Sequence, residues 1–136
     1  MNADDPVALG LPHREPFIFV DRLVSRLPGE SAECTKTFPA NTPFFAGHFP
    51  GAPLVPGVIL AEGLAQTAGL AAGQPGRSFR LTAIRAMKFP AAAGPCEEIR
   101  LAARKVAVVG GLWQFEVRAT VGSRTVAEGV IVLSEA

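Results

Sequence analysis

One long apolar segment in the middle of the chain limits the possible folds more than any other feature. Residues 57–72 read GVILAEGLAQTAGLAA, with Pro56 before them and Gly73 after them. Proline suits the first turn of a helix because its missing N–H needs no partner there, and a glycine is typical of a helix end. A helix that is apolar on almost every side has to be buried. The sequence therefore predicts one buried helix of about 24 Å, which the rest of the chain must enclose.

The segments on either side of this helix have the pattern of β-strands. Before it, strands are expected at about 16–27 and 30–38, and residues 39–56 form a stiff loop with five prolines. After it, four segments rich in Val, Ile, Leu and Phe are expected to be strands, and the last three form antiparallel hairpins because short glycine turns join them: 81–89, 97–109, 112–121 and 125–133. One buried helix with about six antiparallel strands is an α+β arrangement in which the sheet curls round the helix.

Length and composition predict one domain with a large subunit interface. The 136 residues form a single domain over 1–136, in which 1–10 are expected to be a loose leader. The chain is 49% apolar and only 18% charged, and a small monomer has too little interior for that much apolar surface. We therefore expect self-association as a two-fold dimer or a multiple of it, such as a trimer of dimers.

Several classes of protein are not expected. The most apolar window, 51–73, contains Glu62, Gln66 and two prolines, and a membrane span needs about 20 predominantly apolar residues. The acidic start does not resemble a signal peptide, so a cytoplasmic location is expected. Cys34 and Cys96 are isolated, so neither a disulfide nor a metal site is expected. Nucleic acid is a poor candidate partner because the net charge is only +1 and no binding motif is present.

The charge is unevenly distributed along the chain. Residues 77–124 hold nine basic and three acidic side chains. Two interpretations are open: solvated strand faces, or a docking surface for an acidic partner. The residues expected nearest to a site in the second case are Arg77, Arg80, Arg85 and Lys88.

Two titratable residues lie in apolar surroundings, where a charged side chain is unfavourable unless it has a partner or a function. His48 lies in an aromatic loop bounded by Gly and Pro, and Glu62 follows fourteen positions later inside the apolar helix. A carboxylate there must be paired, hydrogen-bonded or shifted in pKa, and an imidazole titrates near neutrality. Such a pair in an apolar cavity is what general acid–base catalysis needs. The structural alternative is a satisfied loop histidine and a glutamate bonded to backbone amides.

Two motifs resemble a known enzyme family. FFAGHFPGAPLVPGVILAEGLAQ at 44–66 resembles the active-site block of the 3-hydroxyacyl-[acyl-carrier-protein] dehydratases of the FabZ/FabA type, and LPHREPFIFVDR at 11–22 resembles their N-terminal signature. Together the motifs cover about 35 of the 136 residues. The resemblance implies the hot-dog fold and removal of water from a 3-hydroxyacyl thioester on acyl carrier protein, giving the trans-2-enoyl thioester.

The resemblance also implies roles for the two titratable residues. His48 matches the general base, which removes the proton alpha to the thioester carbonyl. Glu62 matches the second catalytic position, which protonates or holds the leaving hydroxyl. Glutamate rather than aspartate favours the FabZ-like branch, which dehydrates without isomerising the double bond. In the family the two groups come from opposite subunits. No metal, nicotinamide or flavin is needed, because the thioester itself acidifies the alpha carbon, and the phosphopantetheine of the carrier arrives with the substrate.

Other residues are expected to support the site. Gly57 and Val58 begin the helix, where free N–H groups and the positive end of the dipole could stabilise a thioester oxyanion. Gln66 lies one turn after Glu62 on the same face, and it either orients Glu62 or bonds across a dimer. Phe49 is expected to hold the ring of His48.

The N-terminal signature is interpreted as structural. His13 belongs to its LPHR segment, and a structural role is favoured for this histidine. Asp21 and Arg22 are interpreted as a structural pair near the subunit interface.

The chain departs from the family pattern after the helix. It contains no tyrosine, whereas the family often places one in the following loop to gate the acyl tunnel. The segment 74–79, QPGRSF, offers only Phe79 as an aromatic gate, and the usual Pro-Gly-Asp turn is replaced by PCE at 95–97. A wider or less polar tunnel is expected, which leaves both a fatty-acid pathway and a polyketide or aryl-polyene pathway open.

Two alternative functions have the same fold. A hot-dog thioesterase uses a carboxylate and a water and does not need a histidine fourteen residues upstream. A non-catalytic hot-dog subunit, either an acyl-thioester binder or the silent half of a heteromer with a paralogue, does not need both groups. The joint presence of His48 and Glu62 favours the dehydratase.

Overall fold

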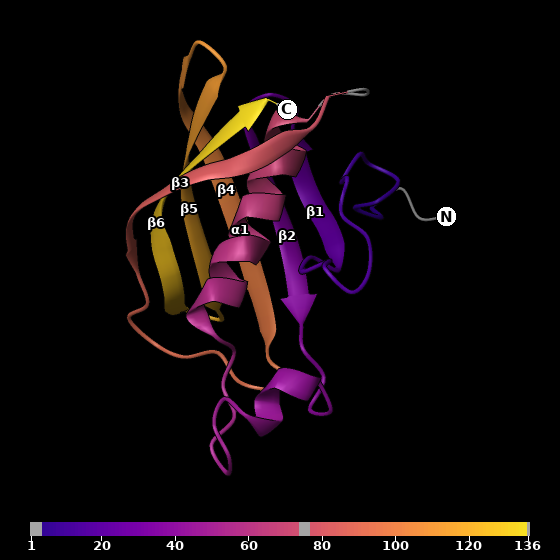
Figure 1. The fold of residues 1–136 in the computed structure, drawn as a ribbon, viewed down its shortest axis with the longest axis vertical. Helices are drawn as coiled ribbons and strands as arrows, with labels where there is room; N and C mark the ends of the chain where they lie inside the picture. Colours follow the sequence, from indigo (N-terminus) through magenta and orange to yellow (C-terminus); the bar gives the residue numbers. More distant parts are fainter. Residues whose placement is uncertain (1–3, 74–76, 136) are drawn as a thin grey trace.

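A single helix lies against one curved antiparallel sheet in the computed structural model, which describes residues 4–73 and 77–135 (Figure 1). The helix α1 (Gly57–Ala72) contacts every strand of the sheet. The strand order is β1-β2-β4-β5-β6-β3, and the strands are β1 (Arg22–Leu27), β2 (Ser31–Thr37), β3 (Phe79–Lys88), β4 (Glu98–Val109), β5 (Leu112–Val121) and β6 (Arg124–Glu135). The predicted α+β architecture, six antiparallel strands curled round one helix, is confirmed.

The element boundaries agree with the sequence except at the first strand. The helix begins and ends where proline and glycine predict. The first strand was expected from residue 16, but β1 begins only at Arg22. The residues before it bond to the helix instead: the Phe17 carbonyl and the Phe19 N–H both bond to the Gln66 side chain. A side-chain amide therefore takes the backbone groups that a neighbouring strand would otherwise take.

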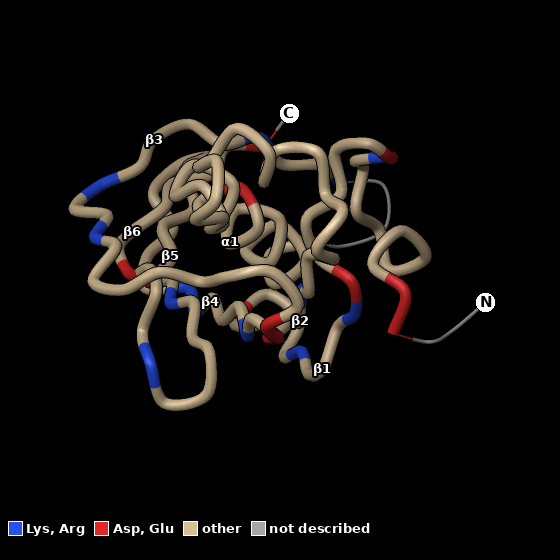
Figure 2. The backbone as a smooth tube through the Cα atoms, turned by 90° about the horizontal axis from the view of Figure 1, so that it is seen from below, with Lys and Arg blue, Asp and Glu red and all other residues tan. Residues whose placement is uncertain are grey.

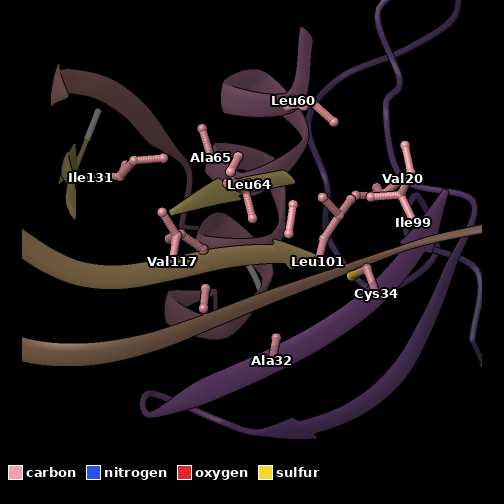
Figure 3. Close-up of a cluster of buried hydrophobic side chains, with 14 of the residues drawn as sticks. Val20, Ala32, Cys34, Leu60, Leu64, Ala65, Ile99, Leu101, Val117 and Ile131 are labelled. Carbon is pink, nitrogen blue, oxygen red and sulfur yellow. The ribbon is translucent and has the colours of Figure 1, made fainter. Parts of the chain in front are cut away.

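The core lies between α1 and the concave face of the sheet. Figure 3 shows Leu64 of the helix in one cluster with Cys34, Leu101 and Val117 of β2, β4 and β5. The helix comes close to its neighbours because it is rich in small residues. A Cβ at Gly63 would lie 3.1 Å from the Phe19 carbonyl oxygen, so a side chain there would push the helix away from the segment that precedes β1.

The convex face of the sheet carries ion pairs between neighbouring strands. Acidic and basic positions lie close together on β2, β4 and β5 (Figure 2), and six of the nine basic side chains in 77–124 pair with a carboxylate. Within the described residues, the three that do not are Arg80, Arg85 and Lys88, and all three belong to the edge strand β3. Most of these basic side chains therefore form ion pairs with carboxylates of this chain, and the three unpaired ones lie on one edge strand.

The two cysteines are both free thiols in different surroundings. Cys34 is buried in β2, and burial raises its pKa to about 11. Cys96 is exposed in the loop before β4. In the ranges 4–73 and 77–135, no helix is long and apolar enough to cross a membrane.

Candidate active site

The carboxyl group of Glu62 is held by a buried amide one turn further along α1. The Gln66 side chain is only 1% exposed, and its Nε2 donates to Glu62 Oε2 at 3.2 Å. Its Oε1 accepts from the Phe19 N–H at 2.9 Å, and Nε2 also donates to the Phe17 carbonyl at 3.1 Å. The amide of Gln66 is thus satisfied as a buried polar group should be. Of the two roles open from sequence, this hydrogen bond within one chain is the contact that orienting Glu62 would need.

A second contact to Glu62 comes from the N-terminal segment. His13 Nε2 lies 3.6 Å from Glu62 Oε2, and the His13 ring stacks on Phe17 with 6.1 Å between centroids. The sequence did not predict this contact, because no spacing or periodicity relates positions so far apart. The only signal was that both residues belong to the two motifs that resemble the dehydratases.

A cavity of about 280 Å³ opens beside this cluster. His13, Glu62 and Gln66 line it together with Phe79, whose ring packs edge-on against Trp113 at 5.3 Å. Most of the remaining lining is apolar and includes Leu9, Leu11, Ala65, Leu70, Leu81 and Leu133, while Arg77, Ser78 and Arg80 add polar side chains. The cavity could take an acyl chain beside a carboxyl group, as ligand sites that are mostly apolar with a few polar groups commonly do. Residues 74–76 of the expected gate lie outside the described residues.

The ring of His48 is oriented by its own loop. It stacks on Phe49 with 4.2 Å between centroids, and its Nδ1 lies 3.1 Å from the Leu54 carbonyl oxygen. A carbonyl can only accept, so Nδ1 carries the proton in this bond and neutral His48 keeps the lone pair on Nε2. The Leu54 N–H closes the loop by donating to the His48 carbonyl at 2.9 Å. The loop therefore sets the orientation of the His48 ring through the Leu54 carbonyl and the Phe49 ring.

The loop before β4 is hydrogen-bonded to the segment that leads into α1 and is closed by its own contacts. The Val55 N–H donates to the Ala93 carbonyl at 2.8 Å. The Glu97 carboxylate accepts from the Gly94 N–H at 2.7 Å and binds Arg124 through both oxygens. Hydrogen bonds from Arg124, and then from Gly94, lower the pKa of Glu97. In the PCE segment the Glu97 carboxylate thus closes the turn that begins at Gly94.

The first N–H groups of α1 are available at the helix start. The Ile59 and Leu60 N–H groups both bond to the Pro56 carbonyl. Within the described residues, the N–H groups of Gly57 and Val58 have no backbone partner, as expected for the first helical positions. A Cβ at Gly57 would lie 3.1 Å from the Phe89 ring, so glycine also allows this ring to cover the helix start.

Within one chain these residues form two separate clusters. Glu62, Gln66, His13 and Phe79 line the cavity, whereas His48 and the helix start do not. In the part of the chain that the structure describes, no hydrogen bond or ion pair joins His48 to Glu62. The same part contains no group of three His, Cys, Asp or Glu residues that could hold a metal ion. Within one chain, His48 therefore does not line the cavity at which Glu62 lies.

Comparisons with known proteins agree with the fold and the motifs. The family model described as ApeI-like, ApeI dehydratase, matches residues 25–130. The 3-hydroxyacyl-[acyl-carrier-protein] dehydratase FabZ of Nitratidesulfovibrio vulgaris (strain DP4) is 37% identical over 127 residues, which is 89% of this chain and 82% of that protein. FabZ of Acetivibrio thermocellus is 39% identical over 125 residues, covering 89% of this chain and 86% of that protein.

Solved structures show the same fold at low sequence identity. The dehydratase heterocomplex ApeI:P from Xenorhabdus doucetiae matches with a TM-score of 0.78 and 15% identity, covering 96% of this chain and 91% of that one. The fluoroacetyl-CoA thioesterase FlK matches with a TM-score of 0.67 and 17% identity, covering 81% of this chain and 87% of that one. The predicted hot-dog fold is confirmed. On the family model and the FabZ relatives together, this chain belongs to the 3-hydroxyacyl-[acyl-carrier-protein] dehydratases of the FabZ and ApeI-like type.

Proposed function

We propose that this protein removes water from a 3-hydroxyacyl chain carried on acyl carrier protein and gives the trans-2-enoyl thioester. The observation that carries the proposal is that a candidate base and a candidate acid are each held in a defined orientation. His48 is held with Nε2 free to accept a proton, and Glu62 is held by Gln66 at the wall of an apolar cavity. The family relationship supplies the substrate class.

The proposed reaction needs only these groups and the thioester. His48 Nε2 takes the proton alpha to the carbonyl, which the thioester makes acidic. The electron pair left on the alpha carbon moves onto the thioester oxygen, where the Gly57 and Val58 N–H groups stabilise the negative charge. As the pair returns to form the double bond, the C–O bond of the 3-hydroxyl breaks, and Glu62 gives the leaving oxygen a proton to release water. No cofactor beyond the substrate's own phosphopantetheine takes part.

A second copy of the chain is proposed to complete the site. The edge strand β3 has one side without a neighbour, and unpaired strand edges are ready to pair with another chain. Large apolar side chains are exposed on this strand and near the helix start: Leu81, Ile84, Val58, Phe89 and Phe49. A two-fold dimer, alone or within a trimer of dimers, would cover them and bring His48 of each subunit to the Glu62 cavity of the other. A hot-dog paralogue in place of the second copy is the alternative.

Mass spectrometry of carrier-bound substrates tests the proposed function. The purified protein is incubated with 3-hydroxyacyl-carrier thioesters of fatty, unsaturated and aryl-polyene type. A product lighter by one water, still attached to the carrier, supports the dehydratase, and the preferred chain identifies the pathway. Release of free acid would identify the thioesterase function, and no change with any chain would favour the non-catalytic subunit.

The unpaired basic side chains of β3 are proposed to dock the carrier. Arg85 and Lys88 have no carboxylate partner among the described residues, and Arg77 and Arg80 line the cavity. Changing Arg85 and Lys88 to glutamate should raise KM for carrier-bound substrate about tenfold or more at low salt, because like charges would then meet across the interface. The measurement is steady-state kinetics on carrier-bound substrate and on a pantetheine thioester of the same acyl chain.

The matched control for docking reverses two cations of the convex face, Arg104 and Arg118, which changes the net charge equally. This control should leave KM for the carrier-bound substrate near the wild-type value. Because β3 also belongs to the proposed dimer edge, the native mass of each variant is measured alongside the kinetics. Equal losses on carrier-bound and pantetheine substrates in a correctly assembled variant would contradict docking through β3.

Phe79 is proposed to shape the cavity rather than to take part in the chemistry. It lines the cavity and packs on Trp113. An apolar wall discriminates among chains by only about 1–3 kcal/mol per methylene, so removing the ring should alter selectivity more than rate. We expect Phe79→Ala to shift the ratio of kcat/KM values between bulky and short chains by about tenfold, with little change on short chains. A uniform loss on all chains would show that Phe79 is needed for the fold or the chemistry.

A further inference from the structure

Gly69 is a glycine in the second half of α1 that close packing does not explain. A glycine inside a helix is unfavourable relative to alanine, and a tight contact with another segment is one reason to have it. Gly63 has such a contact, since a Cβ there would lie 3.1 Å from the Phe19 carbonyl oxygen. A Cβ at Gly69 would meet no atom of the described residues within 4 Å beyond its own part of the helix. Open space therefore lies over Gly69.

This space belongs to the cavity beside Glu62. Gly69 lines that cavity together with Glu62 and Gln66. From Leu60 to Ala72, Glu62 and Gly69 are the two helix residues that are not buried. They are seven positions apart, close to two helical turns, so they lie on one face of α1 and about 10 Å apart along its axis. The cavity therefore extends at least two turns along the helix from the carboxyl group.

Most of the cavity wall around this helix face is apolar. It includes four leucines from the N-terminal segment, β3 and β6: Leu9, Leu11, Leu81 and Leu133. The two arginines in the wall both have partners on β6. Arg77 contacts Glu135 at 3.7 Å, and Arg80 donates to the Ser134 hydroxyl at 3.4 Å. Because sites of this kind bury apolar groups and use a few polar groups for orientation, a hydrocarbon chain is the class of ligand that fits this wall.

We propose that the space over Gly69 takes the distal carbons of the acyl chain, so that Gly69 sets the longest chain that the cavity accepts. The inference rests on the proposed function, in which the 3-hydroxyl of the substrate lies at Glu62. Glu62 is the first residue of α1 in the cavity wall, so the chain extends from it along the helix toward Gly69. A larger side chain at position 69 would occupy this space and shorten the cavity. Gly69 is thus a specificity-determining residue that takes no part in the chemistry.

The stability of Gly69 variants separates specificity from packing. Alanine and leucine are both better helix formers than glycine, and a Cβ at this position has room. Gly69→Ala should therefore raise Tm by a few degrees. Native mass spectrometry is recorded alongside thermal unfolding. A lower Tm or a changed assembly in Gly69→Ala would show that position 69 packs against another part of the fold or against a second subunit, and it would overturn the proposal.

Binding of unreactive chains tests the proposal without turnover. The probes are saturated acyl amides of aminopantetheine with six or fourteen carbons, which have no hydroxyl to lose and no thioester to hydrolyse. By isothermal titration calorimetry, Gly69→Leu should raise Kd for the long chain about tenfold or more with little change for the short chain, because only the long chain reaches position 69. Gly69→Ala should give a smaller change in the same direction.

The matched control is Gly111→Ala. Gly111 lies in the turn between β4 and β5, outside the cavity wall, and a Cβ there also meets no described atom within 4 Å. This control should change neither Kd. A long-chain Kd that Gly69→Leu leaves unchanged, or one that rises equally for both chains, would overturn the proposal.

Kinetics on carrier-bound 3-hydroxyacyl chains of the same two lengths complete the test. The ratio of kcat/KM for the long chain to that for the short chain should fall about tenfold or more in Gly69→Leu. Equal losses on both chains in a folded variant would contradict a role in chain length. If the wild-type protein dehydrates no substrate, the proposed function fails, while the binding of the two amides still decides whether the space over Gly69 takes the end of a chain.

Discussion

Replacing His48 with alanine, or Glu62 with glutamine, is expected to lower kcat for dehydration by about 10²–10⁴ while the protein stays folded. His48→Ala removes the imidazole whose Nδ1 bonds to the Leu54 carbonyl and whose Nε2 is proposed to take the alpha proton. Glu62→Gln keeps the shape of the side chain and an oxygen that can accept from Gln66, but it removes the proton that the leaving hydroxyl needs. Each variant therefore removes one half of the acid–base pair.

The losses are measured as kcat on the preferred carrier-bound chain, with thermal unfolding recorded for each variant. Glu116→Gln is the matched control, because it neutralises an exposed carboxylate on the convex face that pairs with Arg104, and it should keep wild-type kcat. If either catalytic variant retains near-wild-type kcat on a genuine substrate, the role assigned to that residue is wrong. A folded protein that loses activity in both cases supports both roles.

Much of the fold could be predicted because its signals are local. The helix is bounded by Pro56 and Gly73 and is apolar on nearly every side, and its observed ends agree with those signals. The last three strands are separated by glycine turns and are found within a few residues of their expected limits. The start of the first strand was wrong because the backbone at Phe17 and Phe19 bonds to Gln66, almost fifty residues away, and no local pattern records such a contact.

The candidate site also combines residues that local sequence indicates with contacts that only the structure reveals. His48 and Glu62 could be proposed from sequence because each is unusual in its surroundings and because both lie in one motif. The contact between His13 and Glu62 and the pairing of Glu97 with Arg124 were not predicted, since packing of distant segments decides them. The three-dimensional structure was also needed to show that the His48 Nδ1 lies against the Leu54 carbonyl.

Mixing the two inactive variants is expected to restore activity. In the proposed dimer each site takes His48 from one subunit and Glu62 from the other. A hybrid of His48→Ala with Glu62→Gln then has one site with both groups intact and one site with neither. Random exchange of equal amounts makes half of the dimers hybrids, so about a quarter of wild-type activity should return. Neither variant mixed with itself can gain an intact site.

The recovery of activity on mixing tests the shared site most directly. Equal amounts of the two variants are incubated until subunit exchange is complete, as shown by native mass spectrometry of one isotope-labelled partner, and dehydration is then assayed. Activity rising from the background of either variant to about a quarter of wild type, in proportion to the hybrid fraction, is the predicted result. Hybrids that form but stay as inactive as their parents would contradict a site built from His48 of one subunit and Glu62 of the other.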